Sequence, residues 1–259
     1  MMRQRQQRIV DHIQKVGIAS FGELAEMLEV SPFTIRRDID YLSQSRLLVK
    51  IKGGAQRIET ASQFREAQLP SRLQINLKEK ERIAKRALDF IQAGDTIFLD
   101  GSSTIACLAR RLADNGRDIT VVTNSVLITL ELAEASSIRL IGLGGIYDPE
   151  TLSFVGFDVD EDAHSVYIEK AFFSCTGLIP EEGTFENAAF NRNTKRQIAQ
   201  RANRVYVLID SSKVGRRALN RVMGIDEIDV LVTEKAFDEA DQAILERNQV
   251  KVYVTSKGS

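Results

Sequence analysis

Seven short runs of β-branched and aromatic residues follow residue 94, and amphipathic helical stretches separate several of them. The runs are DTIFLD (95–100), ITVVTN (119–124), IRLIGLGG (138–145), KAFFSCTG (170–177), RVYVLID (204–210), IDVLVTE (228–234) and VKVYVT (250–255). Helices are expected at 105–114, 126–135, 186–202 and 237–247. Continuous apolar strands that alternate with helices are typical of a mostly parallel sheet covered on both faces. The sequence therefore predicts an α/β domain.

Polar residues follow several of these strands, and ligands of such sheets bind beyond the carboxyl ends of the strands. The candidate ligand contacts are Asp100, Gly101, Ser102, Ser103, Thr104, Asn124, Ser125, Gly144, Gly145, Thr176, Gly177, Thr184, Glu186, Asp210, Ser211, Ser212 and Lys213. Glycines, hydroxyls and a helix start can surround a phosphate, and Lys213 would supply the positive charge. This composition suits a polyol that carries a phosphate. The alternative is that these residues are only helix caps and turns.

No cofactor or metal is expected. GLGG (142–145) is not a dinucleotide fingerprint, because the third glycine position of GxGxxG falls on Tyr147. Cys107 and Cys175 are far apart and form no CxxC, and neither histidine has a second ligand at zinc spacing. The opening MMRQRQQRIV is unlike a signal peptide, and no apolar run approaches the length of a membrane span. We expect a cytoplasmic protein with reduced thiols.

Charge is distributed unevenly along the chain. Residues 1–57 carry ten Lys and Arg against six Asp and Glu, a balance of +4, whereas the remaining residues carry 25 against 30, a balance of −5. A basic first segment on a mildly acidic body favours a small nucleic-acid-binding module joined to a partner domain.

The pattern before residue 45 predicts three helices. The first spans 4–16, and Ser20 opens the second, with Glu23 completing a capping box. Ser31 can cap the third helix and Pro32 fits its first turn. The third helix has an apolar stripe of Ile35, Ile39 and Leu42. Such an arrangement is typical of a helix-turn-helix.

The segment 46–58 predicts a hairpin of two strands beside the third helix, with Gly53 and Gly54 supplying the positive φ angles of a tight turn. Its lysines would meet phosphates. The candidate DNA contacts are Ser31, Phe33, Thr34, Arg36, Arg37, Lys50, Lys52 and Arg57. Taken alone, the third helix is equally typical of a solvated surface helix, and the basic hairpin beside it favours DNA.

The stretch VSPFTIRRDIDYLSQSRLLVKIKGGA (30–55) resembles the DeoR-type winged helix-turn-helix. Arg46 stands where that family commonly has glycine, and Lys52 replaces the common histidine. GDTIFLDGSST, VVTNS, GG, SFVG, KAFFSCTG and DSSKVG resemble the DeoR sensor domain in order and spacing. The resemblance implies a domain related to ribose 5-phosphate isomerase, and a transcriptional regulator, usually a repressor, released by a phosphorylated sugar. Many members have GADG where this chain has SCTG (174–177).

The expected organisation is a winged helix-turn-helix at 1–58, a linker at 59–75 and a sensor and oligomerisation domain at 76–259, whose first helix begins at Asn76 with Glu79 as capping partner. The expected partners are double-stranded operator DNA, a phosphorylated sugar effector and further copies in a homodimer or homotetramer. No membrane partner and no catalytic residue are expected.

Two alternatives stay open. One is a sugar-phosphate isomerase with an appended DNA-binding module, for which Asp100, Glu186 and Asp210 are the candidate bases. The other is a constitutive DNA-binding protein whose large domain only oligomerises.

Overall fold

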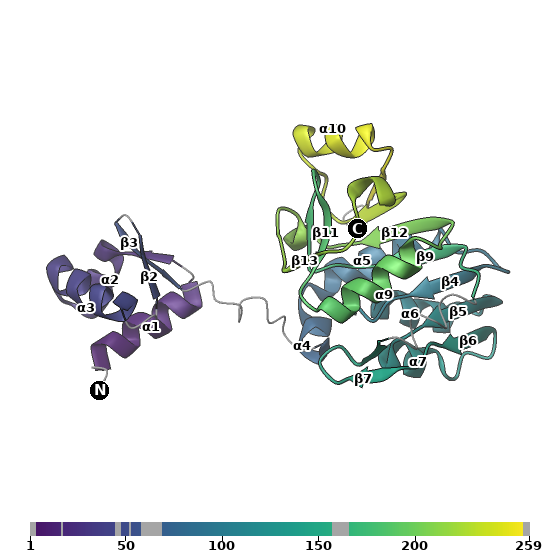
Figure 1. The fold of residues 1–259 in the computed structure, drawn as a ribbon, viewed down its shortest axis with the longest axis horizontal. Coiled ribbons are helices and arrows are strands. Elements are labelled where there is room, and N and C mark those ends of the chain that lie inside the picture. The colour runs from purple at the N-terminus through teal and green to yellow at the C-terminus, as the bar shows by residue number, and fades with distance from the viewer. Residues whose placement is uncertain are drawn as a thin grey trace. The chain divides into compact units, whose positions relative to one another are not determined.

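The N-terminal unit is a helix-turn-helix with a small antiparallel sheet (Figure 1). The computed structural model describes residues 4–16, 18–44, 48–51, 53–57, 69–156 and 166–255, and the chain separates into the units Met1–Gln63 and Phe64–Ser259. The first unit contains α1 (Gln4–Val16), β1 (Ile18–Ser20), α2 (Phe21–Leu28), α3 (Pro32–Gln44), β2 (Leu48–Ile51) and β3 (Gly54–Arg57). Its three helices share one core, to which Ile9, Leu24 and Ile35 contribute fully buried side chains.

Local hydrogen bonds determine where α2 and α3 begin. The Glu23 amide donates to Ser20 Oγ and the Ser20 amide donates to the Glu23 carboxylate at 2.7 Å, which confirms the predicted capping box. The Thr34 amide donates to Ser31 Oγ at 3.2 Å, so Ser31 caps α3 as predicted.

The hairpin of β2 and β3 was predicted, but the third strand was not. β1 pairs with β3, and a Cβ at Gly54 would lie 2.2 Å from the Ala19 carbonyl oxygen. Gly53 has a φ of 90°, whereas Gly54 is outside the left-handed region. The prediction that both glycines supply positive φ angles is therefore wrong for Gly54, whose role is to let β1 approach.

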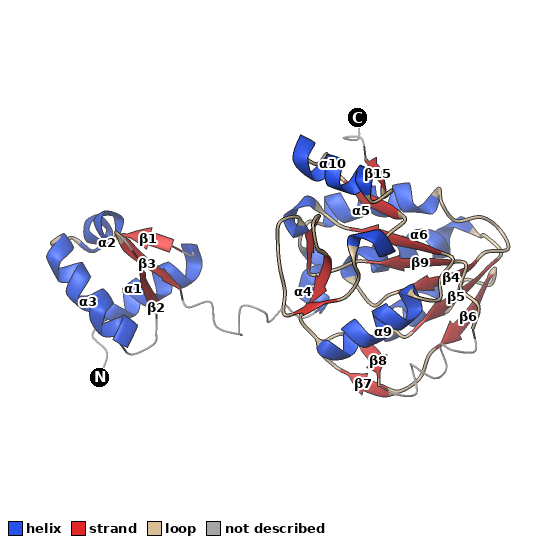
Figure 2. Ribbon diagram, turned by 45° about the horizontal axis from the view of Figure 1, so that its top comes forward, coloured by secondary structure: helices blue, strands red, loops and turns tan. Residues whose placement is uncertain are grey.

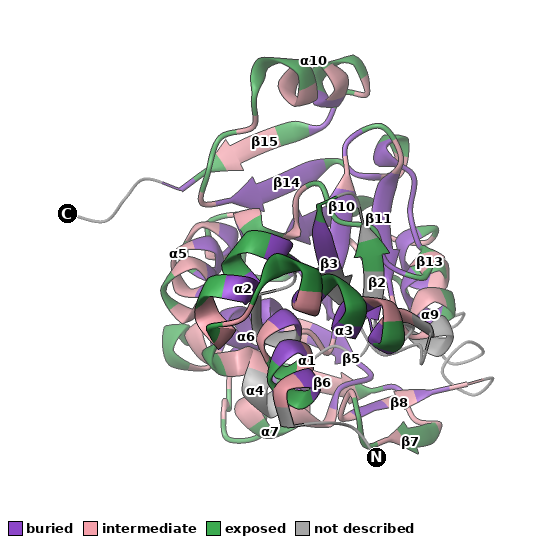
Figure 3. Cartoon of the chain, turned by 90° about the vertical axis from the view of Figure 1, so that its left-hand side faces the viewer, coloured by how far each residue is buried: buried purple, intermediate pink, exposed green. Residues whose placement is uncertain are grey.

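A seven-stranded sheet forms the centre of the second unit, and all its pairings are parallel. Each of the seven predicted runs supplies one strand, which confirms the α/β prediction. In spatial order the strands are β15 (Lys251–Val254), β14 (Val230–Thr233), β12 (Arg204–Leu208), β9 (Lys170–Phe173), β4 (Thr96–Leu99), β5 (Ile119–Thr123) and β6 (Ile138–Gly142). β14 is buried throughout, whereas the edge strand β15 is partly exposed (Figure 3).

Helices cover both faces of this sheet (Figure 2). One core cluster joins the strands to α5 (Leu77–Leu88), α6 (Ser103–Asn115) and α7 (Val126–Leu132); the other joins them to α9 (Ala189–Ala199) and α10 (Glu239–Arg247). Alternation along β4 serves both clusters, because Ile97 and Leu99 enter the first and Phe98 enters the second.

Several short elements differ from the prediction. A three-stranded sheet of β10 (Gly177–Ile179), β11 (Gly183–Glu186) and β13 (Asn220–Arg221) and a hairpin of β7 (Ile146–Asp148) and β8 (Ser153–Val155) were missed. The helix expected at 186–202 begins only at Ala189, because Glu186 belongs to β11. These strands are two to four residues long, too short to show a period.

The segment before α5 also departs from the prediction. α4 (Leu69–Gln74) lies within the expected linker, whose residues 59–68 lie outside the described residues. Asn76 precedes α5 with a φ of 52°, and its side chain makes no capping bond. Instead it donates to Asp210 Oδ1 at 2.9 Å. The predicted pairing of Asn76 with Glu79 is therefore wrong, because a partner 134 residues away takes the amide.

Candidate functional site

A polar cavity opens at the carboxyl ends of β4 and β9, where the sheet meets α6, α9 and the β7–β8 hairpin. It is lined by Arg72, Phe98, Asp100, Gly101, Ser102, Ser103, Thr104, Asn124, Thr151, Ser153, Ser174, Cys175, Glu186, Thr194, Lys195 and Lys213. Eight of the predicted ligand contacts are among them: Asp100, Gly101, Ser102, Ser103, Thr104, Asn124, Glu186 and Lys213. The fold thus gathers residues from strand ends that are far apart in the sequence.

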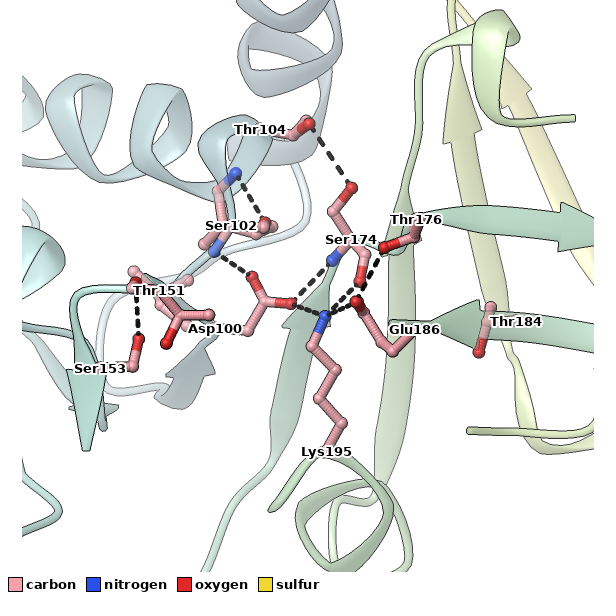
Figure 4. A network of polar contacts seen from close by, with 12 residues as sticks. Asp100, Ser102, Thr104, Thr151, Ser153, Ser174, Thr176, Thr184, Glu186 and Lys195 are labelled. Atoms are coloured by element: carbon pink, nitrogen blue, oxygen red, sulfur yellow. Dashed lines mark hydrogen bonds and ion pairs between the residues drawn. The ribbon is translucent and has the colours of Figure 1, made fainter. Parts of the chain in front are cut away.

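A buried lysine occupies the centre of the site (Figure 4). Lys195 Nζ lies 2.9 Å from Asp100 Oδ2 and 2.5 Å from Glu186 Oε1, and it donates to the Ser174 carbonyl at 2.7 Å. An ammonium group has three N–H donors, so these three contacts use all of them.

The same contacts determine the charge of the network. Burial by itself lowers the pKa of Lys195, but Asp100 and Glu186 outweigh burial and raise its pKa above the ordinary value. The lysine is thereby held as a cation between two carboxylates.

Two backbone amides also donate hydrogen bonds to the Asp100 carboxylate. The Ser102 amide donates to Oδ1 at 2.9 Å and the Ser174 amide donates to Oδ2 at 3.0 Å. Glu186 has a similar support, because Thr176 Oγ1 donates to its Oε2 at 2.9 Å. Both carboxylates are therefore fixed in position as well as paired.

The sequence left open whether the residues after β4 are ligand contacts or only a helix cap. Ser102 caps α6, with its Oγ accepting from the Ile105 amide at 3.4 Å, and it also lines the cavity. A Cβ at Gly101 would lie 2.3 Å from Ser153 Oγ, so the glycine lets the β7–β8 hairpin approach. The start of α6 is thus both a capped helix and a wall of the cavity.

Nine predicted contacts lie outside the cavity lining: Ser125, Gly144, Gly145, Thr176, Gly177, Thr184, Asp210, Ser211 and Ser212. Ser125 caps α7, and Gly144 and Gly145 lie between β6 and β7.

Other members of this group support the small sheet. Thr184 Oγ1 accepts from the Met223 amide, and a Cβ at Gly177 would lie 2.2 Å from the Arg216 carbonyl oxygen. Thr184, expected in a loop, lies within β11, and both residues make contacts within the unit at these positions.

Asp210, Ser211 and Ser212 border Lys213 instead. Asp210 caps the 3-10 turn Ser211–Lys213, and the Ser211 amide donates to Glu234. These contacts orient the turn that brings Lys213 to the cavity.

The cavity residues that sequence reasoning missed are Arg72, Phe98, Thr151, Ser153, Ser174, Cys175, Thr194 and Lys195. Lys195 lies within a helix, where a lysine next to an arginine is typical of a solvated face. Arg72 lies in the expected linker. The available signal was weak: the resemblance marked Ser174 and Cys175 as a departure but assigned them no contact.

Both cysteines are buried and free. Burial raises the pKa of Cys107 to about 11 and that of Cys175 to about 12, so both thiols stay protonated at neutral pH. Within the described ranges, no three His, Cys, Asp or Glu side chains are placed to hold a metal ion, and no helix is long and apolar enough to span a membrane.

The outward side of α3 carries most of the candidate DNA contacts. Phe33, Arg36 and Arg37 are exposed, and the Arg36 guanidinium lies over the Phe21 ring, 5.2 Å from its centroid. Ser31 is exposed and Thr34 partly buried, and their hydroxyls hydrogen-bond to each other. These candidate contacts therefore present two guanidinium groups and one aromatic ring.

The hairpin carries the remaining candidate DNA contacts, Lys50, Lys52 and Arg57. Lys50 Nζ lies 2.5 Å from Asp40 Oδ1, so the lysine is already paired with a residue of α3. Lys52 lies outside the described residues, and Arg57 ends β3.

Two domain families match the chain, one on each unit. DeoR-like helix-turn-helix domains match residues 5–61, and DeoR C terminal sensor domains match residues 75–235. The chain belongs to the DeoR family. As a DeoR-family protein with this helix-turn-helix, it is a DNA-binding transcriptional regulator.

Relatives of this DeoR-family chain match along nearly its whole length. It is 30% identical over 255 residues to the HTH-type transcriptional regulator YulB of Bacillus subtilis, covering 97% of this chain and 96% of the relative. The repressor GlcR of the same organism is 30% identical, with coverage of 96% and 95%. The L-fucose operon activator of Escherichia coli is 32% identical, with coverage of 89% and 94%.

Solved structures show weaker similarity. A D-ribose-5-phosphate isomerase in complex with phospho-erythronic acid matches with a TM-score of 0.41 and 22% identity, over 53% of this chain and 54% of the isomerase. The beta subunit of eIF2B from Chaetomium thermophilum matches with a TM-score of 0.43 and 16% identity, over 60% and 50%. The chain thus spans about half the length of each solved chain, and these scores bear on neither its activity nor its ligand.

Proposed function

We propose that this DeoR-family regulator represses a carbohydrate-catabolism operon and leaves its operator when a phosphorylated sugar binds the cavity. The observation that carries the proposal is the lining of the cavity. Three cations, Arg72, Lys195 and Lys213, face two carboxylates, Asp100 and Glu186, so the charges sum to +1. The cavity also includes the start of α6, where helix N–H groups favour anions.

The polar lining supports a sugar as the remainder of the ligand. Ser102, Ser103, Asn124 and Ser153 present hydroxyl and amide groups that can exchange hydrogen bonds with a polyol. The buried Thr194 hydroxyl has no hydrogen-bond partner among the described residues, and it also lines the cavity. A buried polar atom of this kind favours a ligand or a water as its partner.

For the DNA side, we propose that α3 enters the major groove and the hairpin follows the phosphates. Helix-turn-helix modules bind paired half-sites, so the protein acts as a homodimer or homotetramer, and it acts in the cytoplasm, where its operator lies. Relatives include both a repressor and activators by name, and the repressor GlcR supports repression here.

Several contacts connect the cavity to the segment before α5. Arg72 is part of α4, the first described element after Arg57, and it lines the cavity. Lys80 is buried and donates to the carbonyls of Arg72 at 2.5 Å and Ile75 at 2.6 Å. Asn76 bonds to Asp210, beside the turn that carries Lys213. We propose that a ligand held between Arg72 and Lys213 shifts this segment, which continues along the chain to the DNA-binding unit.

The test is a titration of operator-bound protein with a panel of phosphorylated sugars and their free counterparts. Lys213→Ala should bind operator as wild type does but require much more effector for release, because the phosphate loses a cation. Coupling is reciprocal, so operator DNA should weaken sugar binding by the factor by which sugar weakens DNA binding, typically about 5–150-fold.

The matched control is Lys251→Ala, an exposed lysine on the edge strand β15. It should behave as wild type in both measurements. If Lys213→Ala is released at the same effector concentration as wild type, Lys213 is not part of the effector site. If free sugars release the wild-type protein and no phosphorylated sugar does, the phosphate assignment is wrong.

None of the three candidate bases of the isomerase alternative is well placed for proton abstraction. A general base must reach the proton that it abstracts, yet Asp100 and Glu186 both bind Lys195, and Asp210 lies outside the cavity lining. We expect no turnover of pentose or hexose phosphates, and measurable interconversion by the purified protein would contradict this.

A further inference from the structure

Phe33 is an aromatic ring in a position that the fold of its own unit does not use. Its exposed fraction is 76%, the highest of the large hydrophobic side chains that the structure describes. It lies in the first turn of α3, directly after Pro32. Burial of a ring is favourable in proportion to its apolar area, so a partner that covered Phe33 would gain from the contact.

Helical geometry places the ring at the middle of the outward face. At about 100° per residue, Phe33 lies about 120–180° around α3 from the buried Ile35, Ile39 and Leu42. Arg36 and Arg37 flank it, at about 60° on one side and about 40° on the other. The ring therefore projects from the unit between two guanidinium groups.

The neighbouring contacts leave the ring available. Arg36 is stacked over Phe21 of α2, which draws its guanidinium toward the preceding helix. The first-turn hydroxyls of Ser31 and Thr34 bond to each other. Since the N-terminal residues of a recognition helix reach the base edges, Phe33 in the first turn of α3 is suited to contact them.

The major groove offers one apolar group at its base edges, the C5-methyl group of thymine. A phenyl ring has no hydrogen-bonding atom, so it cannot read the donors and acceptors of the other bases. Two flanking arginines would meanwhile hold phosphates or guanines.

We propose that Phe33 reads a thymine methyl group in each operator half-site and is a specificity-determining residue of this regulator. The inference rests on the proposed docking of α3 in the major groove. It assigns to the operator an invariant thymine at one position of each half-site, next to the bases or phosphates that Arg36 and Arg37 contact.

The experiment replaces each thymine of the operator in turn by deoxyuridine, which removes only the methyl group. The operator is the tightest duplex that the full-length protein selects from a random library. Wild-type protein should lose affinity at one thymine per half-site, by about three- to five-fold for each methyl group that leaves an apolar contact. Phe33→Ala should bind the thymine operator more weakly and be insensitive to deoxyuridine at that position.

Two further variants serve as controls. Phe33→Leu keeps an apolar side chain and should retain part of the deoxyuridine sensitivity. Tyr41→Ala removes another exposed ring from α3 and should retain all of it. Circular dichroism checks that each variant is folded.

Several results would overturn the proposal. Equal deoxyuridine sensitivity in wild type and Phe33→Ala would show that another residue reads the methyl group. Unchanged operator affinity of Phe33→Ala with a changed molecular mass in sedimentation would show that the ring covers a protein surface. If the Arg36 and Arg37 variants bind weakly yet no thymine is sensitive, the docking of α3 stands and only this inference fails.

Discussion

The two units use their cations in opposite ways. In the DNA-binding unit Arg36 and Arg37 are exposed on α3, where water and salt surround them. In the sensor unit Lys195 is buried and paired with Asp100 and Glu186. Exposed charges act over a distance and are screened by salt, whereas buried charges are screened far less and must be paired.

The difference teaches what each cation can do. A solvated arginine can exchange its hydration for a DNA phosphate or base, and this exchange makes affinity depend on salt. A buried lysine with all three donors used cannot serve a new anion without breaking the network. Lys195 therefore holds Asp100 and Glu186 within the cavity lining, while Arg72 and Lys213 are the lining cations proposed to meet the ligand.

The largest expected effect is on stability. Lys195→Met leaves two buried carboxylates without their cation, and removal of one partner from a buried pair destabilises by about 3–5 kcal/mol. Urea denaturation followed by circular dichroism measures the loss, which should fall on the sensor unit. Because the pKa of Lys195 is raised, its contribution is complete below the unfolded value of about 10.4 and disappears as pH rises through the higher folded value.

A matched control separates this network from an ordinary ion pair. Lys170 Nζ lies 2.5 Å from Asp95 Oδ2 at the amino-terminal ends of β9 and β4. This pair is less buried than the Lys195 network, and Asp95 is the carboxylate partner of Lys170 among the described residues. Lys170→Met should therefore destabilise less. Combining Lys195→Met with Asp100→Asn and Glu186→Gln should recover much of the loss, and no recovery would show that packing rather than charge caused it.

The next effect is on operator binding. Arg36→Ala and Arg37→Ala should each weaken it by roughly 1–3 kcal/mol if a base contact is lost, whereas a lost phosphate contact weakens all sequences alike and lowers the salt slope by about 1. Fluorescence anisotropy at several salt concentrations distinguishes the two. Arg86→Ala is the control, because Arg86 also stacks on an aromatic ring, Phe90, at 5.2 Å but belongs to the sensor unit. Unchanged affinity in the folded Arg36 and Arg37 double variant would refute the assignment of α3.

The smallest expected effect concerns the pair of Lys50 and Asp40. Both side chains are more than 40% exposed, so the pair contributes at most about 1 kcal/mol to stability. Asp40→Asn removes a negative charge from the side of α3 that is proposed to face DNA and releases Lys50, and operator affinity should rise a few-fold at low salt, with a steeper salt dependence. Asp114→Asn, an exposed change in the sensor unit, should have no such effect. Weaker binding by Asp40→Asn would show that the pair orients Lys50.

Local patterns in the sequence were sufficient for most of the fold. Apolar periodicity located the seven strands of the sheet, and hydroxyl caps located the starts of α2 and α3. Both patterns depend only on residues that are near one another in the sequence, so they can be recognised without knowledge of the tertiary structure. The rule that ligands bind at the carboxyl ends of strands also predicted that Asp100, Asn124 and Lys213 lie close together, and all three line one cavity.

Tertiary structure alone decided the partners of residues far apart in the sequence. Lys195 of α9 reaches Asp100 beyond the carboxyl end of β4, and the Asn76 side chain donates to Asp210 instead of capping a helix. Gly54 is required by β1, more than thirty residues earlier, and not by its own turn. No local period records such contacts, because packing between elements determines which polar groups meet. The sequence by itself thus determined the elements and their order, and packing decided which charges are buried together.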